Sequence, residues 1–349
     1  MQPSSIAQKE SQFASTLKLA SGTVFKDCGT TNIPDGFTIR SIRPNDQSYY
    51  YQAVTPKKSI CLHFTVGYIM SDIAALSKAG DHVSVSYVVD RGGRIYELFP
   101  DKFWSYHLGS SALGGNSVMS KQSIGIEISN YGPLTLKDGK LIDAYGNAYC
   151  SQAETEFYEA CDYRGHKYYA TMSQVQIKAV AALVKYLSAK HSIPLNFVTN
   201  DEPFKSANDA VNFSGVFFHS NVRKDKFDWP LSKSMSCVLD ICKGTNAAAS
   251  VAAAPKQQSA LDAAKAEAKT VKMETVPVKE PEPAKAEPTK PEPVQVKQEP
   301  AKATPVQAAP AQTQSTAKAA ASSTTSSSSK SGGMFSNILK SIKKLFHLG

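Results

Sequence analysis

The sequence predicts an α/β domain in which a mixed central β-sheet is flanked by helices. Three observations lead to this prediction. Apolar, strand-like runs occupy residues 59–67, 83–90 and 123–130. Segments with helical spacing of apolar residues separate such runs, most clearly over 173–194. Aromatic residues and alternating apolar runs are frequent only up to about Gly244.

The change of composition near Gly244 divides the 349 residues into four parts. We expect a mobile N-terminal arm or a frayed helix over residues 1–25 and one folded domain over 26–244. Residues 245–333 are rich in Ala, Pro, Lys and Glu and then in Ser and Thr, which predicts a disordered linker. Residues 334–349 predict a short basic amphipathic helix, because apolar residues repeat on one helical face and lysines lie beside it.

The elements of the first half follow from local patterns. Residues 36–54 carry β-rich runs around an Arg-Pro-Asn-Asp turn. An apolar strand over 59–67 ends in glycine, and a short helix follows over 71–80, capped by a serine and stopped by glycine. Strands over 83–90 and 94–99 are joined by an Arg-Gly-Gly turn and therefore predict a hairpin.

The second half alternates between a strand, an excursion and a helix. Residues 123–130 predict a strand that is apolar on both faces except for Glu127. Residues 131–170 form a long excursion with a Lys-Asp-Gly-Lys hairpin signal. Ser173 caps a helix that continues until a Ser-Ile-Pro sequence ends it.

Charge and targeting signals limit the partners of the chain. The formal net charge of +9 fits an anionic partner such as a cell-wall polymer or a membrane surface. No basic-aromatic motif of a nucleic-acid module occurs, so we expect no nucleic-acid partner. Residues 1–25 lack the apolar region of a signal peptide, and no apolar run is long enough to span a bilayer as a helix. We therefore expect synthesis in the cytoplasm.

Cysteine usage leaves two readings open. No C-x-x-C pair exists, which argues against a cysteine zinc cluster. Cys150 with Cys161, and Cys237 with Cys242, would form local disulfides after export. Buried or free thiols in a reducing cytosol fit the same pattern.

A single loop over residues 217–230 carries much of the chemistry. It holds an imidazole, an ammonium and a carboxylate at His219, Lys226 and Asp228. Residues two apart in an extended segment point the same way, so Lys226 is expected to face the same site as Asp228. A catalytic zinc site needs three protein ligands and one open position, and His219 with Asp228 would supply two of the ligands.

Two polar residues interrupt apolar strands elsewhere. His63 alone would more often be a hydrogen-bonded core histidine than a ligand. Glu127 in Ile-Gly-Ile-Glu-Ile must be either functional or paired in a buried salt bridge, for example with Lys226. His107, in the same loop as Trp104, is most simply a histidine that lines a groove. Together these residues supply what metal-assisted amide hydrolysis needs.

Five segments, taken in order, carry a resemblance. They read Ile-Cys-Leu-His-Phe-Thr-Val-Gly, Val-Ser-Val-Ser-Tyr-Val-Val-Asp-Arg-Gly-Gly-Arg-Ile-Tyr-Glu, Trp-Ser-Tyr-His-Leu-Gly, Ser-Ile-Gly-Ile-Glu-Ile-Ser-Asn and His-Ser-Asn-Val-Arg-Lys-Asp-Lys-Phe-Asp-Trp-Pro. This series resembles the zinc-dependent N-acetylmuramoyl-L-alanine amidases of type 2, which are related to peptidoglycan recognition proteins and phage amidase-lysozymes. The resemblance covers about residues 55–235 and implies a type-2 amidase-like fold.

The resemblance also implies roles for individual residues. It implies that Zn²⁺ is bound by His63, His219 and Asp228. Asp225 is a nearby alternative for the third ligand, but Asp228 keeps the Lys-x-Asp order.

Further roles follow from the same resemblance. It implies that Glu127 and Lys226 serve catalysis. It also implies that His107 lines the substrate groove without binding the metal, and we expect Trp104 to bind substrate there as well.

The expected function is that of a peptidoglycan hydrolase. Zinc-activated water would cleave the amide bond between N-acetylmuramic acid and L-alanine, in peptidoglycan or in a muropeptide. The amphipathic helix over 334–349 would bind an anionic membrane surface, and the enzyme would act at the bacterial cell wall after release or delivery. The alternatives are a peptidoglycan-binding module without catalysis and a cytosolic muropeptide-recycling amidase.

Overall fold

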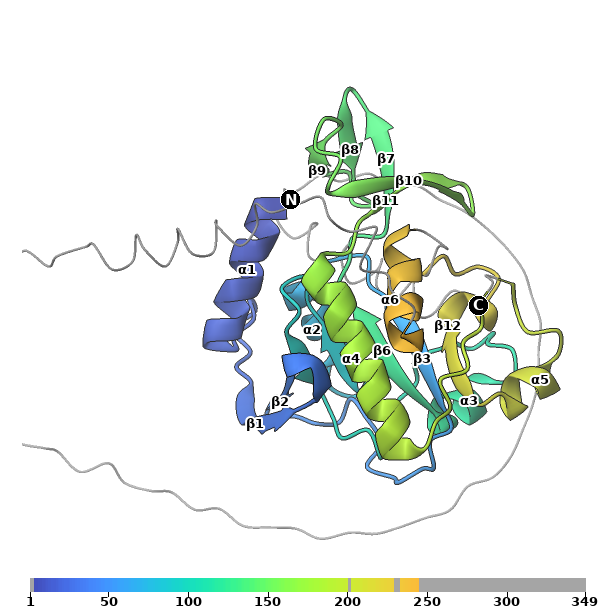
Figure 1. The fold of residues 1–349 in the computed structure, drawn as a ribbon. Helices are drawn as coiled ribbons and strands as arrows, with labels where there is room; N and C mark the ends of the chain where they lie inside the picture. The colour runs from blue at the N-terminus through green and yellow to red at the C-terminus, as the bar shows by residue number, and fades with distance from the viewer. Residues whose placement is uncertain (1–2, 200–201, 229–232, 245–349) are drawn as a thin grey trace, which may run out of the picture. The chain divides into compact units, whose positions relative to one another are not determined.

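A seven-stranded mixed sheet lies at the centre of the domain in the computed structural model, which describes residues 3–199, 202–228 and 233–244 (Figure 1). The strand order is β1-β2-β5-β4-β6-β3-β12. The neighbours β4, β6, β3 and β12 run parallel, whereas β4 pairs with β5, and β1 with β2, in antiparallel fashion. The strands are β1 (Lys26–Asn32), β2 (Thr38–Arg43), β3 (Ser59–Phe64), β4 (Tyr87–Val89), β5 (Ile95–Glu97), β6 (Ser123–Ile128) and β12 (Gly215–Phe218). The predicted mixed sheet is confirmed.

The two central strands, β3 and β6, are buried along their whole length. Their near-continuous apolar sequences suit parallel strands that are covered on both faces. Their register pairs Leu62 with Ile126 and His63 with Glu127. The two polar residues noted in the sequence are therefore direct neighbours on adjacent strands.

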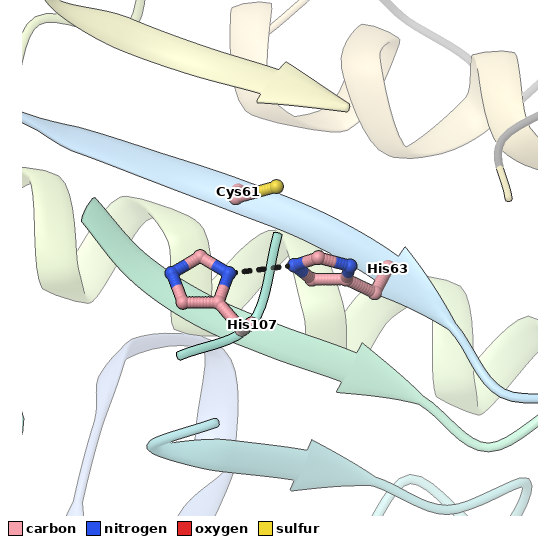
Figure 2. Close-up of side chains that lie close together, drawn as sticks. All are labelled: Cys61, His63 and His107. Atoms are coloured by element: carbon pink, nitrogen blue, oxygen red, sulfur yellow. Dashed lines mark hydrogen bonds between the residues drawn. The ribbon is translucent and has the colours of Figure 1, made fainter. Parts of the chain in front are cut away.

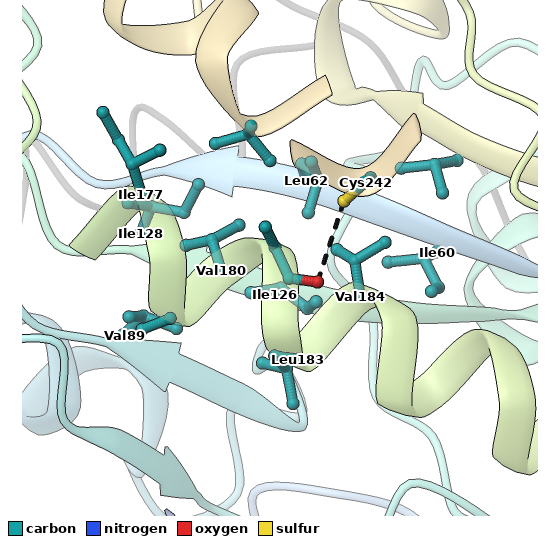
Figure 3. Close-up of a cluster of buried hydrophobic side chains, with 14 of the residues drawn as sticks. Ile60, Leu62, Val89, Ile126, Ile128, Ile177, Val180, Leu183, Val184 and Cys242 are labelled. Carbon is teal, nitrogen blue, oxygen red and sulfur yellow. Dashed lines mark hydrogen bonds between the residues drawn. The ribbon is translucent and has the colours of Figure 1, made fainter. Parts of the chain in front are cut away.

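One face of the sheet is covered by α4 (Gln174–His191) and α6 (Lys233–Lys243). Figure 3 shows apolar side chains of α4 packed on those of β3 and β6. The predicted cap is present, since the Ser173 hydroxyl accepts a hydrogen bond from the backbone N–H of Gln176 at 3.1 Å. Ser192, in the left-handed conformation, ends the helix.

The opposite face is partly covered by α2 (Ile69–Leu76), which begins two residues earlier than predicted. Ser71 is not its cap but its third residue, and the Ser71 hydroxyl donates to the carbonyl of Tyr68 at 2.8 Å. The remaining short helices are α3 (Asn116–Gln122) and α5 (Ala207–Asn212), with 3-10 turns η1 (Pro34–Gly36) and η2 (His219–Asn221).

The N-terminal segment contains a packed helix, whereas a mobile arm or a frayed helix was expected for residues 1–25. Helix α1 spans Pro3–Thr16, and Phe13 is buried with its ring centroid 5.4 Å from that of Tyr96 and 6.1 Å from that of Phe25. The backbone N–H of Arg91 donates to the buried carboxylate of Glu10 at 3.2 Å. The buried side chains of Phe13 and Glu10 attach this helix to the domain, so the expectation of a mobile arm is wrong.

The excursion over residues 131–170 folds as a second, five-stranded antiparallel sheet, which we call the auxiliary sheet. The predicted Lys-Asp-Gly-Lys hairpin is confirmed, because Asp138 and Gly139 both have positive φ between paired residues Lys137 and Lys140. In the order β10-β11-β7-β8-β9, its strands are β10 (Tyr158–Tyr163), β11 (His166–Ala170), β7 (Pro133–Lys137), β8 (Lys140–Ile142) and β9 (Ala148–Ser151).

Two further expectations concern the disulfides and the C-terminal segments. All six cysteines lie in the described ranges and carry free thiols, so neither proposed local disulfide is formed. The linker over 245–333 and the helix over 334–349 lie outside the described residues. Within those that are described, no helix combines the length and the apolar character needed to cross a membrane.

Candidate metal centre and catalytic residues

The parallel pairing of β12 with β3 brings two histidines together. Phe218, the last residue of β12, pairs with Leu62, so His219 follows at the level of His63 although the two are 156 residues apart. The loop after η2 then returns Asp228 to the same point. Each of these three side chains is at most 2% exposed.

The three residues present their ligand atoms to one another as a nearly regular triangle. Nδ1 of His63 lies 3.1 Å from Nδ1 of His219, and Oδ2 of Asp228 lies 3.3 Å and 2.9 Å from these nitrogens, respectively. A tetrahedral zinc site with bonds of about 2.0–2.1 Å has ligand–ligand edges of about 3.3 Å. The triangle therefore has nearly the size that a zinc ion requires.

The donor chemistry also fits a zinc ion. Two imidazoles and one carboxylate form a donor set that zinc accepts. The other carboxylate oxygen of Asp228, Oδ1, is buried and has no hydrogen-bond partner among the described residues. Burial would raise the pKa of Asp228, but His219 and His63 hold it below its usual range, so the carboxylate is ionised. An ionised, incompletely bonded carboxylate is suited to a cation.

The hydrogen bonds behind the histidines select the tautomer that a ligand needs. Nε2 of His219 lies 3.0 Å from the carbonyl oxygen of Leu108, to which only a protonated nitrogen can donate. In a neutral imidazole with its proton on Nε2, Nδ1 carries the lone pair, and this atom faces the triangle. Metal-binding histidines commonly donate their second N–H to a carbonyl in this way.

The tautomer of His63 is set through a longer chain of hydrogen bonds. The Ser123 hydroxyl donates to the carbonyl of Met119 at 2.7 Å, so its oxygen accepts from Nε2 of His107 at 3.0 Å. Nδ1 of His107 then accepts from Nε2 of His63 at 2.9 Å (Figure 2). Burial, together with His219, lowers the pKa of His63 to about 4, which keeps its imidazole neutral.

His107 is consequently not the groove-lining residue that was expected. Its side chain is buried behind His63, and burial lowers its pKa well below the usual value. Gly125 makes this position possible, because a Cβ there would lie 3.3 Å from Cγ of His107 and 2.7 Å from a methyl group of Val85. His107 therefore supports His63 from inside the protein.

A second group of possible ligands, drawn in Figure 2, lies on the inner side of His63. It consists of Cys61, His63 and His107, all fully buried. Burial raises the pKa of the Cys61 thiol well above its usual value, so the sulfur stays protonated. The two imidazoles already share a hydrogen bond. We therefore interpret Cys61 and His107 as buried residues that pack against His63, and not as metal ligands.

Glu127 and Lys226 lie near the triangle as a buried acid and a buried amine. Burial raises the pKa of Glu127 well above the usual value, and Asp228 adds to this effect. Burial lowers the pKa of Lys226, opposed by the nearby charge of Asp228. No salt bridge joins Glu127 to Lys226 in the described part of the chain, and Oε2 of Glu127 has no hydrogen-bond partner there. The alternative of a purely structural ion pair between them is therefore not observed.

The competing carboxylate, Asp225, has a different partner. Arg223 donates to both of its oxygens, at 2.7 Å and 2.6 Å, and thus holds Asp225 away from the histidines. Arg223 is itself buried and also donates to the carbonyl of Leu108 at 3.3 Å. The structure thus brings Asp228, and not Asp225, to the triangle.

The sequence analysis did not identify Asp72, which connects the ends of the two central strands. This buried aspartate of α2 accepts hydrogen bonds from Thr65 at 3.0 Å and Ser129 at 2.6 Å, just beyond the ends of β3 and β6. Its only signal was a carboxylate in a predominantly apolar helix. Trp104, in contrast, stacks on Tyr51 with ring centroids 4.3 Å apart, and its expected role in substrate binding stays a prediction.

Comparisons with known proteins place the chain among amidases. Residues 53–228 match the family model described as N-acetylmuramoyl-L-alanine amidase. A search of curated proteins finds no match. Among solved structures, the amidase AmiD from E. coli, in complex with a muropeptide substrate, is 26% identical, with 42% of this chain and 48% of that chain covered and a TM-score of 0.28.

Two other solved structures are similar at lower identity. The amidase LysC from Clostridium intestinale is 15% identical, with 59% of this chain and 97% of that chain covered and a TM-score of 0.32. AmpDh3 from Pseudomonas aeruginosa, in complex with anhydromuramic pentapeptide, is 17% identical, with coverage of 49% and 53% and a TM-score of 0.30. The aligned part thus spans about half of AmiD and of AmpDh3 and nearly all of LysC.

Proposed function

Since the chain belongs to the N-acetylmuramoyl-L-alanine amidase family, we propose that its folded domain is a zinc-dependent amidase acting on peptidoglycan or muropeptides. The bond cleaved is the amide between the lactyl group of N-acetylmuramic acid and L-alanine. The observation that carries the proposal is the triangle of His63, His219 and Asp228 with Glu127 on the neighbouring strand.

The ion would be held by the two Nδ1 atoms of the histidines and by Oδ2 of Asp228. When bound, zinc supplies a Lewis acid that polarises a carbonyl and lowers the pKa of water. His107 and the carbonyl of Leu108 keep the N–H of each histidine on the side away from the ion. These contacts orient the ligands before substrate arrives.

Proton transfer falls to Glu127. In its ionised form, Glu127 would accept a proton from attacking water and pass it to the leaving amine. Lys226, buried nearby, stabilises the negative charge that develops on the carbonyl oxygen. A module that only binds peptidoglycan needs neither group, and the buried, unpaired Oε2 of Glu127 therefore favours catalysis.

The test combines metal analysis with product analysis on the purified full-length chain. We expect one zinc per chain, reversible loss of activity with a chelator, and free L-alanine amino termini in digested peptidoglycan by mass spectrometry. Asp228→Ala should lose both zinc and activity, whereas Asp225→Ala, which removes a carboxylate three residues away, should retain zinc. An active protein without stoichiometric metal contradicts the proposal.

A further inference from the structure

The auxiliary sheet reaches the loop that carries two of the site residues. Its β10–β11 hairpin ends in a two-residue turn, with Arg164 at φ 46° and Gly165 at φ 83° between the paired residues Tyr163 and His166. Nη1 of Arg164 donates to the backbone carbonyls of Arg223 at 3.3 Å and Lys224 at 2.9 Å. It also donates to the carbonyl of Lys226. One guanidinium thus contacts three carbonyls of the loop over residues 222–228, which we call the ligand loop.

A ring contact reinforces this attachment. Phe227 lies between Lys226 and Asp228 in the chain, and its ring centroid is 5.4 Å from that of His166 in β11. It is also 6.4 Å from the ring of Phe64, at the end of β3. Lys226 and Asp228 are both buried, while Phe227 is only partly buried. The residue between the two site residues is therefore held by both sheets.

The chemistry of these contacts suits a positioning role. The ligand loop has no regular backbone pairing along most of its length, so its carbonyls need donors from elsewhere. All three contacts come from Nη1, whose N–H groups are held in the plane of the guanidinium, whereas the ammonium of a lysine sits on a flexible stem. Misplacement of a site residue by about 1 Å can cost on the order of 100-fold in rate.

We propose that Arg164 is a positioning residue, which fixes the ligand loop and thereby the placement of Lys226 and Asp228. The kinetic consequence rests on the proposed amidase function, whereas the structural consequence does not. Loss of the guanidinium should loosen the loop and weaken zinc binding by about 10–100-fold, the range found when outer contacts of metal ligands are removed. The effect on kcat should exceed that on KM, because Lys226 and Asp228 serve the chemical step.

The test compares Arg164→Ala with Lys167→Ala in the full-length protein. Lys167 is an exposed cation on the same hairpin, so its removal controls for charge. Hydrogen exchange of residues 222–228 in metal-free protein, zinc affinity by chelator competition, and kcat and KM on a soluble muropeptide would be measured. We expect faster exchange, weaker zinc binding and lower kcat only in Arg164→Ala, with an intermediate effect in Arg164→Lys.

Chemical rescue separates a specific contact from general destabilisation. Millimolar guanidinium should restore part of the zinc affinity of Arg164→Ala, while sodium chloride at equal concentration should not. Indistinguishable loop exchange and zinc affinity in Arg164→Ala and Lys167→Ala would overturn the proposal even if the wild type is active. Faster loop exchange in Arg164→Ala, in a protein without amidase activity, would support the positioning role and reject the amidase function.

Discussion

The two faces of strands β3 and β6 have the same backbone but opposite properties. On one face Leu62 and Ile126 pack under α4 (Figure 3). On the other face His63 and Glu127 lie side by side in the register of the same strands. Successive side chains of a strand point to opposite faces of the sheet. Each of these core residues is therefore followed in the chain by a residue of the site.

The comparison shows how the domain tolerates a buried polar site. Burial lowers the pKa of His63 to about 4 and raises that of Glu127 well above its usual value, which indicates that ionising either group inside the protein is unfavourable. Burying apolar area on the other face is favourable, at about 25 cal/mol per Å². The same strands can therefore offset the cost of the site with the stability of the core.

The largest expected effect comes from neutralising the polar face. Glu127→Gln should lower kcat by about 10²–10⁴-fold, because the substitution removes the proposed proton acceptor. The free energy of unfolding at pH 7 should stay equal or increase, because the amide removes a buried acid whose pKa is raised. Steady-state kinetics with zinc analysis and urea unfolding would check both statements. Near-normal turnover with full zinc content would reject the role of Glu127.

A substitution on the apolar face should lower stability and leave kcat nearly unchanged. Ile126→Ala leaves a cavity under α4 and should lower the free energy of unfolding by about 2–5 kcal/mol. The kcat of the folded fraction should change little, because Ile126 points away from the triangle. Urea denaturation and active-site titration with zinc would measure the two quantities. A large loss of kcat at full folding and zinc content would show that the faces are coupled.

A smaller effect is expected at an acid remote from the triangle. Burial and Asp90 raise the pKa of Glu10 in α1 to about 8, and burial raises that of Asp90 to about 6, although Arg94 opposes it. The folded protein thus favours the neutral carboxyl of Glu10, so this contribution to stability is full below about pH 4.5 and is lost as pH rises through about 8. Glu10→Gln should reduce this decline by on the order of 1–3 kcal/mol across the window.

Thermal or urea unfolding at several pH values would test the prediction for Glu10. The glutamine retains an oxygen that can accept from the N–H of Arg91, so the docking contact of α1 is kept. Asp162→Asn, in an exposed position of β10, is a suitable control for loss of one acidic group. An equally steep decline in wild type and Glu10→Gln would assign the pH dependence to other groups.

The sequence predicted the elements whose signal is local. His63 and Glu127 were recognisable because polar residues interrupt apolar strands, and the family resemblance, with its Lys-x-Asp order, pointed to Asp228. The packing of helix α1 on the domain was not predicted, because few of its residues are apolar and its contacts with Tyr96 and Arg91 are distant in sequence. The contacts of Arg164 go to backbone carbonyls, which every residue has, so no sequence pattern marks them.

The pairing of β3 with β12 also has a consequence for folding kinetics. The two histidines approach only after a segment of 156 residues has been closed into a loop, and such long-range pairings form slowly. The triangle is therefore expected to be complete only after the sheet has assembled. Interactions absent from the transition state slow unfolding without accelerating folding. An ion bound at the triangle would thus prolong the lifetime of the native protein more than it would hasten its formation.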